Sequence, residues 1–354
     1  MIRVLIVDDS VVVQRLLTRE LSKAPDIQVV GTAGDPFVAR ERIAELSPDV
    51  ITLDIEMPRM DGLTFLGKLM RHHPLPVVVV SSLSQEGSET ALNALSLGAV
   101  DVVGKPSSQF SIPDVAGRLV DAIRAAAVAR VRTTTFVPTV TKLSPALPLP
   151  STHRVLAIGA STGGTRALEE ILSRLPADGP ATAIVQHMPA DFTGPFAKRL
   201  NGLCGMEVRE ARDGDALVNG VVLLAPGGDH LTVVRNGAHY AVRVQPGEPV
   251  RYHRPSVDVL FQSVAKSAGA NGMGVILTGM GDDGARGLLA MRSAGARTIA
   301  QDEATSVVFG MPKVACELGA AESVMGLERI ADAAMRWARS PSSLPVAQRP
   351  AAAQ

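Results

Sequence analysis

The sequence predicts an α/β protein with two domains, and three observations support this fold class. The chain has 354 residues, enough to build two separate hydrophobic cores. Short runs of Val, Ile and Leu alternate with stretches of helical periodicity, a pattern typical of parallel sheets covered by helices on both faces. A Thr- and Pro-rich stretch without periodicity, residues 133–150, separates two such series and indicates a linker.

The first alternating series, residues 1–125, predicts a flavodoxin-like, doubly wound parallel sheet. Its expected strands are Val4–Val7, Gln28–Gly31, Val50–Leu53, Val77–Val80 and Ala99–Val103. The apolar residues that share one helical face after the first strand are Val13, Leu16, Leu17 and Leu21. A last helix is expected from about Pro113 to about Arg130, where it passes into the linker.

The predicted linker covers residues 126–152, and a second α/β series follows it. This series, residues 153–339, predicts a Rossmann-like domain whose first strand and helix are Val155–Ile158 and Thr165–Leu172. The last residues, 340–354, are rich in Pro, Ala and Ser. We expect this tail to be disordered, because it has too little apolar surface to bury.

Composition excludes several classes of protein. Lys plus Arg equal Asp plus Glu, so the net charge is zero and we expect neither a nucleic-acid partner nor general attraction to anionic membranes. The N-terminal apolar run stops at Asp8, too early for a signal peptide, and no run is long enough for membrane insertion. Cys204 and Cys316 are too few and too far apart for a disulfide framework, which favours the cytoplasm.

Polar residues follow four of the five strands expected in the first domain. They are Asp8, Asp9, Asp54, Ser81 and Lys105. Because the carboxyl ends of parallel strands meet at one sheet edge, we expect these side chains to gather there. Three carboxylates together repel one another unless a cation lies between them, and oxygen ligands of this kind suit Mg²⁺. A phosphorylation site is therefore predicted; a nucleotide site or a plain metal site is the alternative.

The same residues resemble the motifs of response-regulator receiver domains. The matching segments are Ile6–Ser10, Leu53–Gly62 and Gly104–Pro106. The resemblance implies that a histidine kinase supplies a phosphoryl group to Asp54. It also implies that Asp9, Asp54 and the backbone of Glu56 hold Mg²⁺, with Asp8 assisting, and that Ser81 and Lys105 support the phosphoryl group.

Two further expectations come from this resemblance. The Lys105–Pro106 bond is expected to be cis. Val102 stands where many receiver domains carry an aromatic switch residue, so the output of this domain is not expected to use an aromatic rotamer.

In the second domain, a glycine-rich turn carries a serine between a strand and a helix. The turn is Gly159-Ala160-Ser161-Thr162-Gly163-Gly164. Such a turn exposes the Ser161 hydroxyl near a helix N-terminus, as a nucleophile requires if a base and backbone donors are also present. Turns of small residues also bind phosphate, so a phosphate site is the alternative.

Several histidines and acids compete as partners of Ser161. His187 follows the apolar strand Ala181–Gln186, and His230 also follows an apolar strand. His253 precedes a segment that indicates a helix start, with Ser256 as its cap. An acid in the turn after the strand Gly274–Leu277 could orient the histidine, but spacing leaves Asp282 and Asp283 both open. The glycines nearby leave backbone N–H groups free for an oxyanion hole.

These segments resemble the catalytic domain of the CheB family, protein-glutamate methylesterases that act on chemotaxis receptors. The matching segments are Ile158–Gly164, Gln186–Pro189, Arg254–Asp258, Thr278–Gly284 and Gln301–Glu303. The resemblance implies a triad of Ser161, His187 and Asp283, with the backbone at Met280 stabilising the oxyanion. It also implies hydrolysis of glutamyl methyl esters and deamidation of glutamines on chemoreceptors, with no cofactor for the ester chemistry.

The order of the two domains predicts how activity is controlled. We expect the unphosphorylated first domain to pack over the strand ends that carry Ser161 and to block access. Phosphorylation of Asp54 would then shift the face that touches the second domain. A nucleotide-binding output and a DNA-binding output are the rival hypotheses; the neutral charge and the lack of a recognisable helix-turn-helix weigh against the latter.

Overall fold

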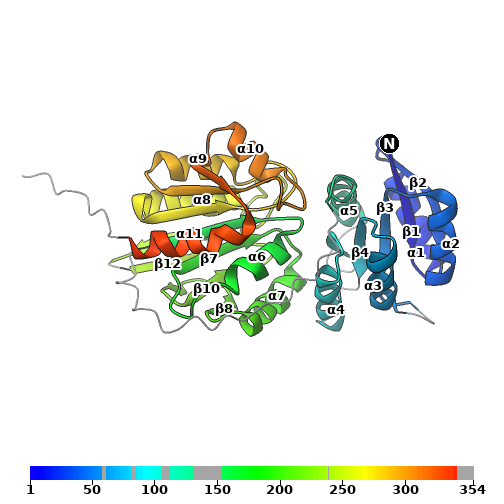
Figure 1. The fold of residues 1–354 in the computed structure, drawn as a ribbon, viewed down its shortest axis with the longest axis horizontal. Helices are drawn as coiled ribbons and strands as arrows, with labels where there is room; N and C mark the ends of the chain where they lie inside the picture. The colour runs from blue at the N-terminus through cyan, green and yellow to red at the C-terminus, as the bar shows by residue number, and fades with distance from the viewer. Residues whose placement is uncertain (58–60, 82–84, 106–111, 131–153, 238, 341–354) are drawn as a thin grey trace, which may run out of the picture.

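The computed structural model describes all residues except 58–60, 82–84, 106–111, 131–153, 238 and 341–354. The described residues form two domains that lie side by side, each with a central parallel sheet between helices (Figure 1). The predicted α/β class is therefore confirmed. Residues 131–152, which make up most of the predicted linker, lie outside the described residues. The same is true of Pro106, and so of the expected cis Lys105–Pro106 bond, and of nearly all of the predicted tail.

The N-terminal domain holds a five-stranded parallel sheet in the order β2-β1-β3-β4-β5. Its strands are β1 (Ile2–Val7), β2 (Ile27–Ala33), β3 (Val50–Asp54), β4 (Val77–Ser81) and β5 (Asp101–Gly104). Its helices are α1 (Val11–Leu21), α2 (Pro36–Leu46), α3 (Gly62–His72), α4 (Gln85–Ser96) and α5 (Ile112–Ala127). The strand order reverses between β1 and β3, which is where open sheets of this type bind ligands.

Local chemistry explains where these helices begin. The Ser10 hydroxyl accepts the Val13 N–H at the start of α1, and the Asp61 carboxylate accepts the Thr64 N–H at the start of α3. Asp35 caps α2 in the same way, and Pro36 occupies the first turn, where its missing N–H has no cost. The starts of α1, α2 and α3 are thus encoded by single residues.

The C-terminal domain contains a seven-stranded parallel sheet in the order β15-β14-β13-β6-β7-β10-β8. Its strands are β6 (Val155–Ala160), β7 (Ala181–Gln186), β8 (Glu207–Glu210), β10 (Val221–Leu224), β13 (Gly272–Ile276), β14 (Arg297–Gln301) and β15 (Ser323–Met325). A second, antiparallel sheet in the order β11-β12-β9 consists of β9 (Ala216–Leu217), β11 (His230–Asn236) and β12 (His239–Gln245).

The helices of this domain cover both faces of the parallel sheet. They are α6 (Gly164–Leu172), α7 (Ala190–Leu203), α8 (Val257–Ser267), α9 (Ala285–Ser293), α10 (Met311–Glu317) and α11 (Leu327–Arg339), with a short 3₁₀ turn at Gly269–Asn271. Strand β6 lies between β13 and β7, so the strand order changes direction there. A crevice at the carboxyl ends of these three strands is therefore expected from topology.

Apolar packing continues from one domain into the other. Leu92 of α4 is buried among residues of the C-terminal core, and Phe192 of α7 is buried among residues of the N-terminal core. Figure 1 shows α4 and α7 facing each other across the domain boundary. The Arg199 guanidinium donates to Asn93 Oδ1 at 3.1 Å and to Ser96 Oγ at 2.7 Å, which ties α7 to α4.

A second contact joins the end of the N-terminal domain to a loop of the C-terminal domain. The Arg130 N–H donates to the Val307 carbonyl at 3.0 Å, and its guanidinium pairs with Glu303 at 2.7 Å. Val307 also packs against the apolar core of the N-terminal domain. The two domains thus meet along helices and loops at the carboxyl edge of β6.

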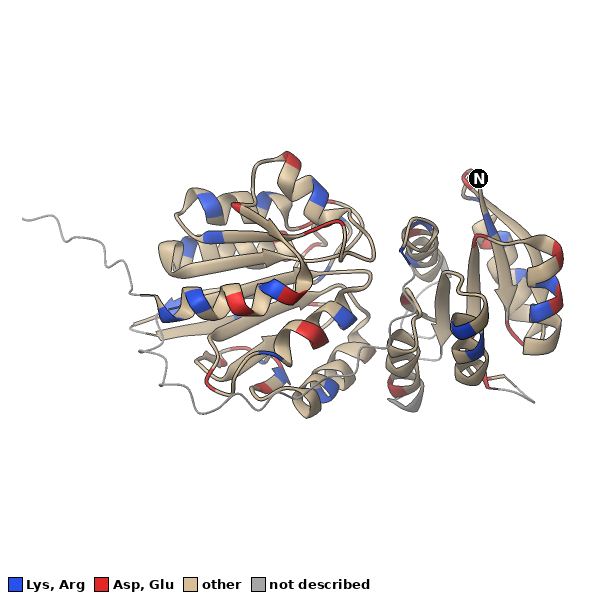
Figure 2. Cartoon of the chain, in the orientation of Figure 1, with Lys and Arg blue, Asp and Glu red and all other residues tan. Residues whose placement is uncertain are grey.

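Charged side chains lie mostly on helices and loops, and helices such as α11 carry both acidic and basic residues (Figure 2). The strands of both parallel sheets carry few charges, in keeping with their burial on two faces. None of the described helices combines the length and the hydropathy that crossing a bilayer would require.

Candidate functional site

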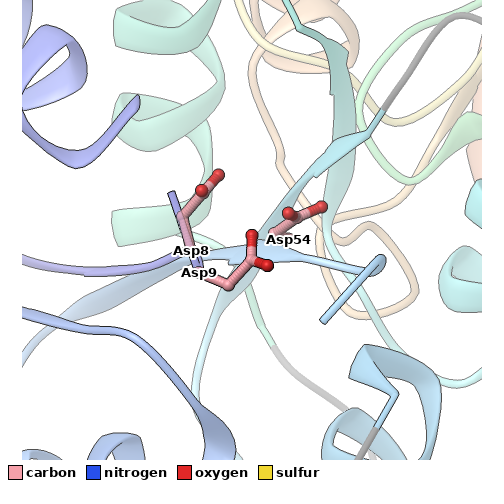
Figure 3. A group of neighbouring side chains, drawn as sticks. All are labelled: Asp8, Asp9 and Asp54. Carbon is pink, nitrogen blue, oxygen red and sulfur yellow. The ribbon is translucent and has the colours of Figure 1, made fainter. Parts of the chain in front are cut away.

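Three carboxylates converge at the carboxyl edge of the N-terminal sheet. Asp8 and Asp9 follow β1, and Asp54 is the last residue of β3; one oxygen of each lies within 4.8 Å of the others (Figure 3). Asp8 and Asp54 are buried, whereas Asp9 is exposed. We call these three residues the acidic pocket. Their arrangement offers oxygen ligands from one side, as a hard divalent cation such as Mg²⁺ prefers.

Lys105 is the cation of this pocket. Its Nζ lies 2.6 Å from Asp54 Oδ2 and 3.2 Å from Asp8 Oδ2. Burial raises the pKa of Asp54, the Lys105 ammonium opposes that rise, and the Asp8 charge adds to it. Burial lowers the Lys105 pKa, but the hydrogen bond and charge of Asp54 outweigh it, so this pKa is raised. The net acidity of the pocket favours binding of a further cation.

The remaining predicted residues of this pocket lie nearby but differ in their contacts. The Glu56 N–H donates to Asp54 Oδ1 at 3.2 Å, which places the Glu56 backbone beside the pocket. Ser81 ends β4 and is fully buried. Its hydroxyl donates to the Gly87 carbonyl at 3.4 Å, so it is engaged with the start of α4 rather than with Asp54.

Ser161 lies in the turn between β6 and α6. Its N–H donates to the Thr278 carbonyl at 3.0 Å, which fixes the turn against the loop that follows β13. Gly163 has φ of +79°, and a Cβ there would lie 2.6 Å from Val307 Cβ. Glycine is therefore required twice over, for its conformation and for the close approach of the 302–309 loop.

His187 and Asp283 form a buried hydrogen-bonded pair beside this turn. His187 Nε2 lies 2.9 Å from Asp283 Oδ2, and the two side chains are 8% and 1% exposed. Ser161 and His187 border the same small cavity. Three of the predicted site residues, which are far apart in sequence, are thus brought to the carboxyl ends of β6 and β7 and to the loop after β13.

Asp283 is held by donors at the start of α8. The Ser256 hydroxyl donates to its Oδ1 at 2.8 Å, the Asp258 N–H to Oδ1 at 3.0 Å and the Val257 N–H to Oδ2 at 2.7 Å. Burial by itself would raise the pKa of Asp283. The hydrogen bonds from His187 and the backbone outweigh burial and lower this pKa to about 2. Asp283 is therefore a fixed negative charge.

The rival histidine and acid have structural contacts of their own. His230 Nδ1 accepts the Ser256 N–H at 3.2 Å, and its Nε2 lies 3.0 Å from the Glu248 carbonyl. Asp282 forms an ion pair with Arg251. Ser256 caps α8 as predicted, accepting the Val259 N–H. His253 was expected only to precede this helix, yet its ring stacks on that of His187 with 3.8 Å between centroids.

The loop after β13 runs directly beside Ser161. A Cβ added to Gly279 would lie 2.6 Å from Ser161 Cβ, so only glycine fits at this approach. Met280 follows Gly279 and is 36% exposed. The predicted role of its backbone N–H in stabilising an oxyanion stays a prediction.

The N-terminal domain borders the Ser161 cavity. Its contribution comes from α4 and from around β5, namely Leu95, Val100, Asp101 and Val102. The Thr162 hydroxyl donates to Asp101 Oδ2 at 2.7 Å, and burial raises the Asp101 pKa. Sequence reasoning missed Asp101 and Thr162, and it did not foresee that the ring of His253 stacks on His187. The one available indication was Asp101 itself, a carboxylate that opens an otherwise apolar strand.

Comparisons with known proteins cover nearly the whole chain. Residues 4–116 match the response regulator receiver domain, and residues 156–334 match the CheB methylesterase family. A protein-glutamate methylesterase/protein-glutamine glutaminase of Syntrophus aciditrophicus is 55% identical over 339 residues, 95% of this chain and 98% of the relative. One of Xanthomonas campestris pv. campestris is 53% identical over 342 residues, 94% and 96% of the two chains. The crystal structure of the Thermotoga maritima CheB methylesterase catalytic domain is 35% identical, with a TM-score of 0.51; it covers 52% of this chain and 97% of that one.

Proposed function

This chain belongs to the CheB methylesterase family and carries a receiver domain, and from that premise we propose its reaction and its control. The C-terminal domain is a serine hydrolase that removes methyl esters from glutamate side chains of chemoreceptors. The same site deamidates receptor glutamines, and the N-terminal receiver domain controls both activities in chemotaxis adaptation. The relatives named above carry both activities in their names.

The hydrogen bond between His187 and Asp283, beside the cavity that Ser161 borders, is the observation that carries this proposal. Asp283 is ionised, so the nitrogen facing it, Nε2, carries a proton. Nδ1 of His187 is then the basic nitrogen. Among the described residues this buried atom has no hydrogen-bond partner, so it is free to accept a proton.

The reaction follows from these groups in two steps. Nδ1 of His187 takes the proton of the Ser161 hydroxyl while Oγ attacks the ester carbonyl, and the Met280 N–H stabilises the oxyanion. The C–O bond to the methoxy group breaks, and His187 returns the proton so that methanol leaves. Water, deprotonated by His187, then hydrolyses the acyl-serine to free glutamate and restores Ser161. With glutamine, ammonia leaves in place of methanol.

In the receiver domain, Asp54 is the proposed phosphoryl acceptor and a histidine kinase the donor. Asp8, Asp9, Asp54 and the Glu56 backbone would hold Mg²⁺, which screens the charges of the incoming phosphoryl group. Lys105 already contacts Asp54 and would pair with the phosphoryl oxygens. Ser81 would exchange its contact with Gly87 for a hydrogen bond to the new phosphoryl group.

Control of the esterase rests on the receiver covering the Ser161 cavity. Asp101 and Val102, which belong to β5, border that cavity, and Lys105 directly follows the same strand. A phosphoryl group on Asp54 would draw Lys105 and Ser81 toward it and move the ends of β4 and β5. The α4–α7 contact and the Asp101–Thr162 hydrogen bond would then weaken, which admits the receptor. We place this reaction in the cytoplasm, where the kinase and the receptor's methylated segments are expected.

The experiment is methanol release from membranes that contain methylated receptors, with and without a small phosphodonor. We expect the phosphodonor to raise the rate, and we expect Ser161→Ala to lower it by about 10⁴ or more, as in other serine hydrolases. Methanol release that persists in Ser161→Ala would refute the nucleophile assignment.

A further inference from the structure

We propose that His253 is a positioning residue for His187: its stacked ring fixes the plane of the catalytic imidazole and stabilises that imidazole while it holds the proton from Ser161. This inference rests on the proposed serine-hydrolase function and adds a residue to it. It comes from the geometry of the two rings and of the turn that carries His253.

The two imidazole rings are stacked. Their centroids lie 3.8 Å apart, and their planes differ by 10°. His187 is also held at one edge, because Nε2 bonds to Asp283. A ring held at one edge and covered on one face keeps its plane, so the free Nδ1 keeps a constant direction. Small displacements of reacting groups reduce turnover strongly, and a fixed ring plane therefore favours proton transfer.

The chain accepts backbone strain to place His253 there. Val250 and His253 exchange two backbone hydrogen bonds, of 3.0 and 2.9 Å, across a tight turn. The central residues, Arg251 and Tyr252, have φ of +50° and +67°. Turns with two positive φ angles normally use Asn and Gly. Strain of this kind persists where surrounding contacts hold it, and it gathers at functional sites.

The contacts that hold this turn come from residues around Asp283. Arg251 Nε lies 3.4 Å from Asp258 Oδ2, and its guanidinium also pairs with Asp282. Tyr252 is 98% exposed, so the turn does not serve to bury this aromatic ring. Arg251 thus anchors the turn to Asp258 and Asp282, beside the proposed catalytic acid Asp283. The turn places the ring of His253 against that of His187.

The charges around the ring pair favour a neutral His253. Three ionisable groups interact electrostatically with His253: His187, Asp283 and Arg118, the last from α5 of the receiver domain. Asp101 of β5 interacts electrostatically with His187. Burial is the main cause that lowers the pKa of His253, the charges of His187 and Arg118 add to it, Asp283 opposes it, and the resulting pKa is about 3. His253 therefore stays neutral at physiological pH. A neutral aromatic ring attracts a cation above its face, whereas two charged imidazoles would repel each other.

The test compares three replacements in the full-length protein with saturating phosphodonor, measuring kcat and KM for methanol release. His253→Phe keeps a flat aromatic face, His253→Leu keeps apolar volume without that face, and His253→Ala removes both. We expect Phe to stay within about 3-fold of the wild-type kcat, and Leu and Ala to lose on the order of 10-fold, which lies between the effects of an exposed and a desolvated cation–π contact. KM should change little, because His253 stacks on His187 and lies outside the cavity that Ser161 borders.

Two results would overturn the inference. If His253→Phe were as inactive as Ser161→Ala, His253 would take part in proton transfer. If Leu matched Phe, the side chain would only fill space. Tyr252→Asn is the matched control, because Asn accepts the same backbone angles and Tyr252 is exposed; its kcat should equal that of the wild type.

The Ser161→Ala variant separates this inference from the proposed function. If wild-type methanol release did not depend on Ser161, the serine-hydrolase proposal itself would fail. If release depended on Ser161 while Phe, Leu and Ala behaved alike, only the role of His253 would fail. Circular dichroism melting of each variant identifies any loss of folding, and a variant that melts early is assayed below its melting temperature.

Discussion

Asp54 and Asp283 occupy similar places in the two domains, yet their environments shift their pKa values in opposite directions. Each lies at or beyond the carboxyl end of a central parallel strand, and each is 1% exposed. The pKa of Asp54 is raised, whereas that of Asp283 is lowered to about 2. The exposed fraction is the same for both residues, so burial does not explain why their pKa values shift in opposite directions.

The neighbours of the two carboxylates explain it. Asp283 accepts hydrogen bonds from two N–H groups in the first turn of α8, from Ser256 and from His187. Donors at a helix N-terminus stabilise an anion. Asp54 has one backbone donor, at Glu56, and Lys105, and it faces the charge of Asp8. Asp283 is thus a permanent charge bonded to His187, whereas the ionised form of Asp54 is destabilised by burial and by Asp8.

Of the substitutions at these two carboxylates, we expect the replacement of Asp283 to have the largest effect, a loss of turnover. Asp283→Asn keeps the shape of the side chain but loses the charge that holds the proton on Nε2 of His187. We expect kcat to fall about 10⁴-fold, as when the acid of another serine triad is changed to its amide. Steady-state methanol release measures this. A decrease of less than about 10-fold would show that Asp283 does not orient the base.

The matching change at Asp54 should affect only control. Asp54→Asn removes the phosphoryl acceptor, so we expect the phosphodonor to have no effect while basal turnover stays within about 2-fold of the wild type. Omitting Mg²⁺ from the wild type should abolish activation in the same way, because the acidic pocket then repels the donor. Activation that survives Asp54→Asn would move the phosphorylation site to another residue.

A smaller effect is expected where the two domains touch. Replacing Asn93 and Ser96 together with Ala removes both acceptors of Arg199 on α4 and leaves the C-terminal domain unchanged. We expect basal turnover of the unphosphorylated protein to rise roughly 5-fold, since partly exposed hydrogen bonds to a charged group contribute about 1 kcal/mol together. Turnover of the phosphorylated protein should not change. An equal rise in both states would argue against occlusion by the receiver domain.

The smallest expected effects are on the free energy of unfolding, and they test the comparison of Asp54 with Asp283 most directly. The folded pKa of Asp283 is depressed, so its stabilisation is present above pH 4 and is lost as pH falls from about 4 to about 2. A shift from 3.8 to about 2 corresponds to about 2 kcal/mol at neutral pH. The folded pKa of Asp54 is raised, so its ionised form destabilises the receiver domain at neutral pH, and acid relieves this.

At pH 7 the two Asn variants should therefore change stability in opposite directions. Asp283→Asn should destabilise the C-terminal domain, which urea unfolding followed by the fluorescence of Trp337, the single tryptophan, reports directly. Asp54→Asn should stabilise the receiver domain, as measured by the thermal transition in circular dichroism. Equal signs for the two variants would break the comparison.

Much of the fold was predictable because it depends on short-range patterns. The strand Ala181–Gln186 was predicted with its observed limits, and the other expected strands were found with ends shifted by a few residues. Polar residues directly after strands identified the acidic pocket and His187, because strand ends of a parallel sheet share one edge. The antiparallel sheet of β9, β11 and β12 was not predicted, although Asn236-Gly237 between two apolar runs is a local signal for the β11–β12 hairpin.

The choice between rival residues depended on distant contacts. Spacing left His187 and His230 open as the base, and their hydrogen-bond partners distinguish them: Asp283 for the first, the Ser256 N–H and the Glu248 carbonyl for the second. The stacking of His253 could not be predicted, because it requires two positive φ angles at Arg251 and Tyr252 that these residue types rarely adopt.

The sequence by itself determined the α/β class, the two sheet edges that carry the chemistry and the small set of residues that could act there. Periodicity and strand-end polarity act within a few residues and so can be read locally. Tertiary structure alone decided which donors surround each carboxylate, which ring lies on His187 and that Asp101 reaches Thr162, 61 residues away. Those contacts form only when separate strands are brought together. They determine the pKa values of Asp54 and Asp283, because charges and hydrogen bonds act over a few ångströms.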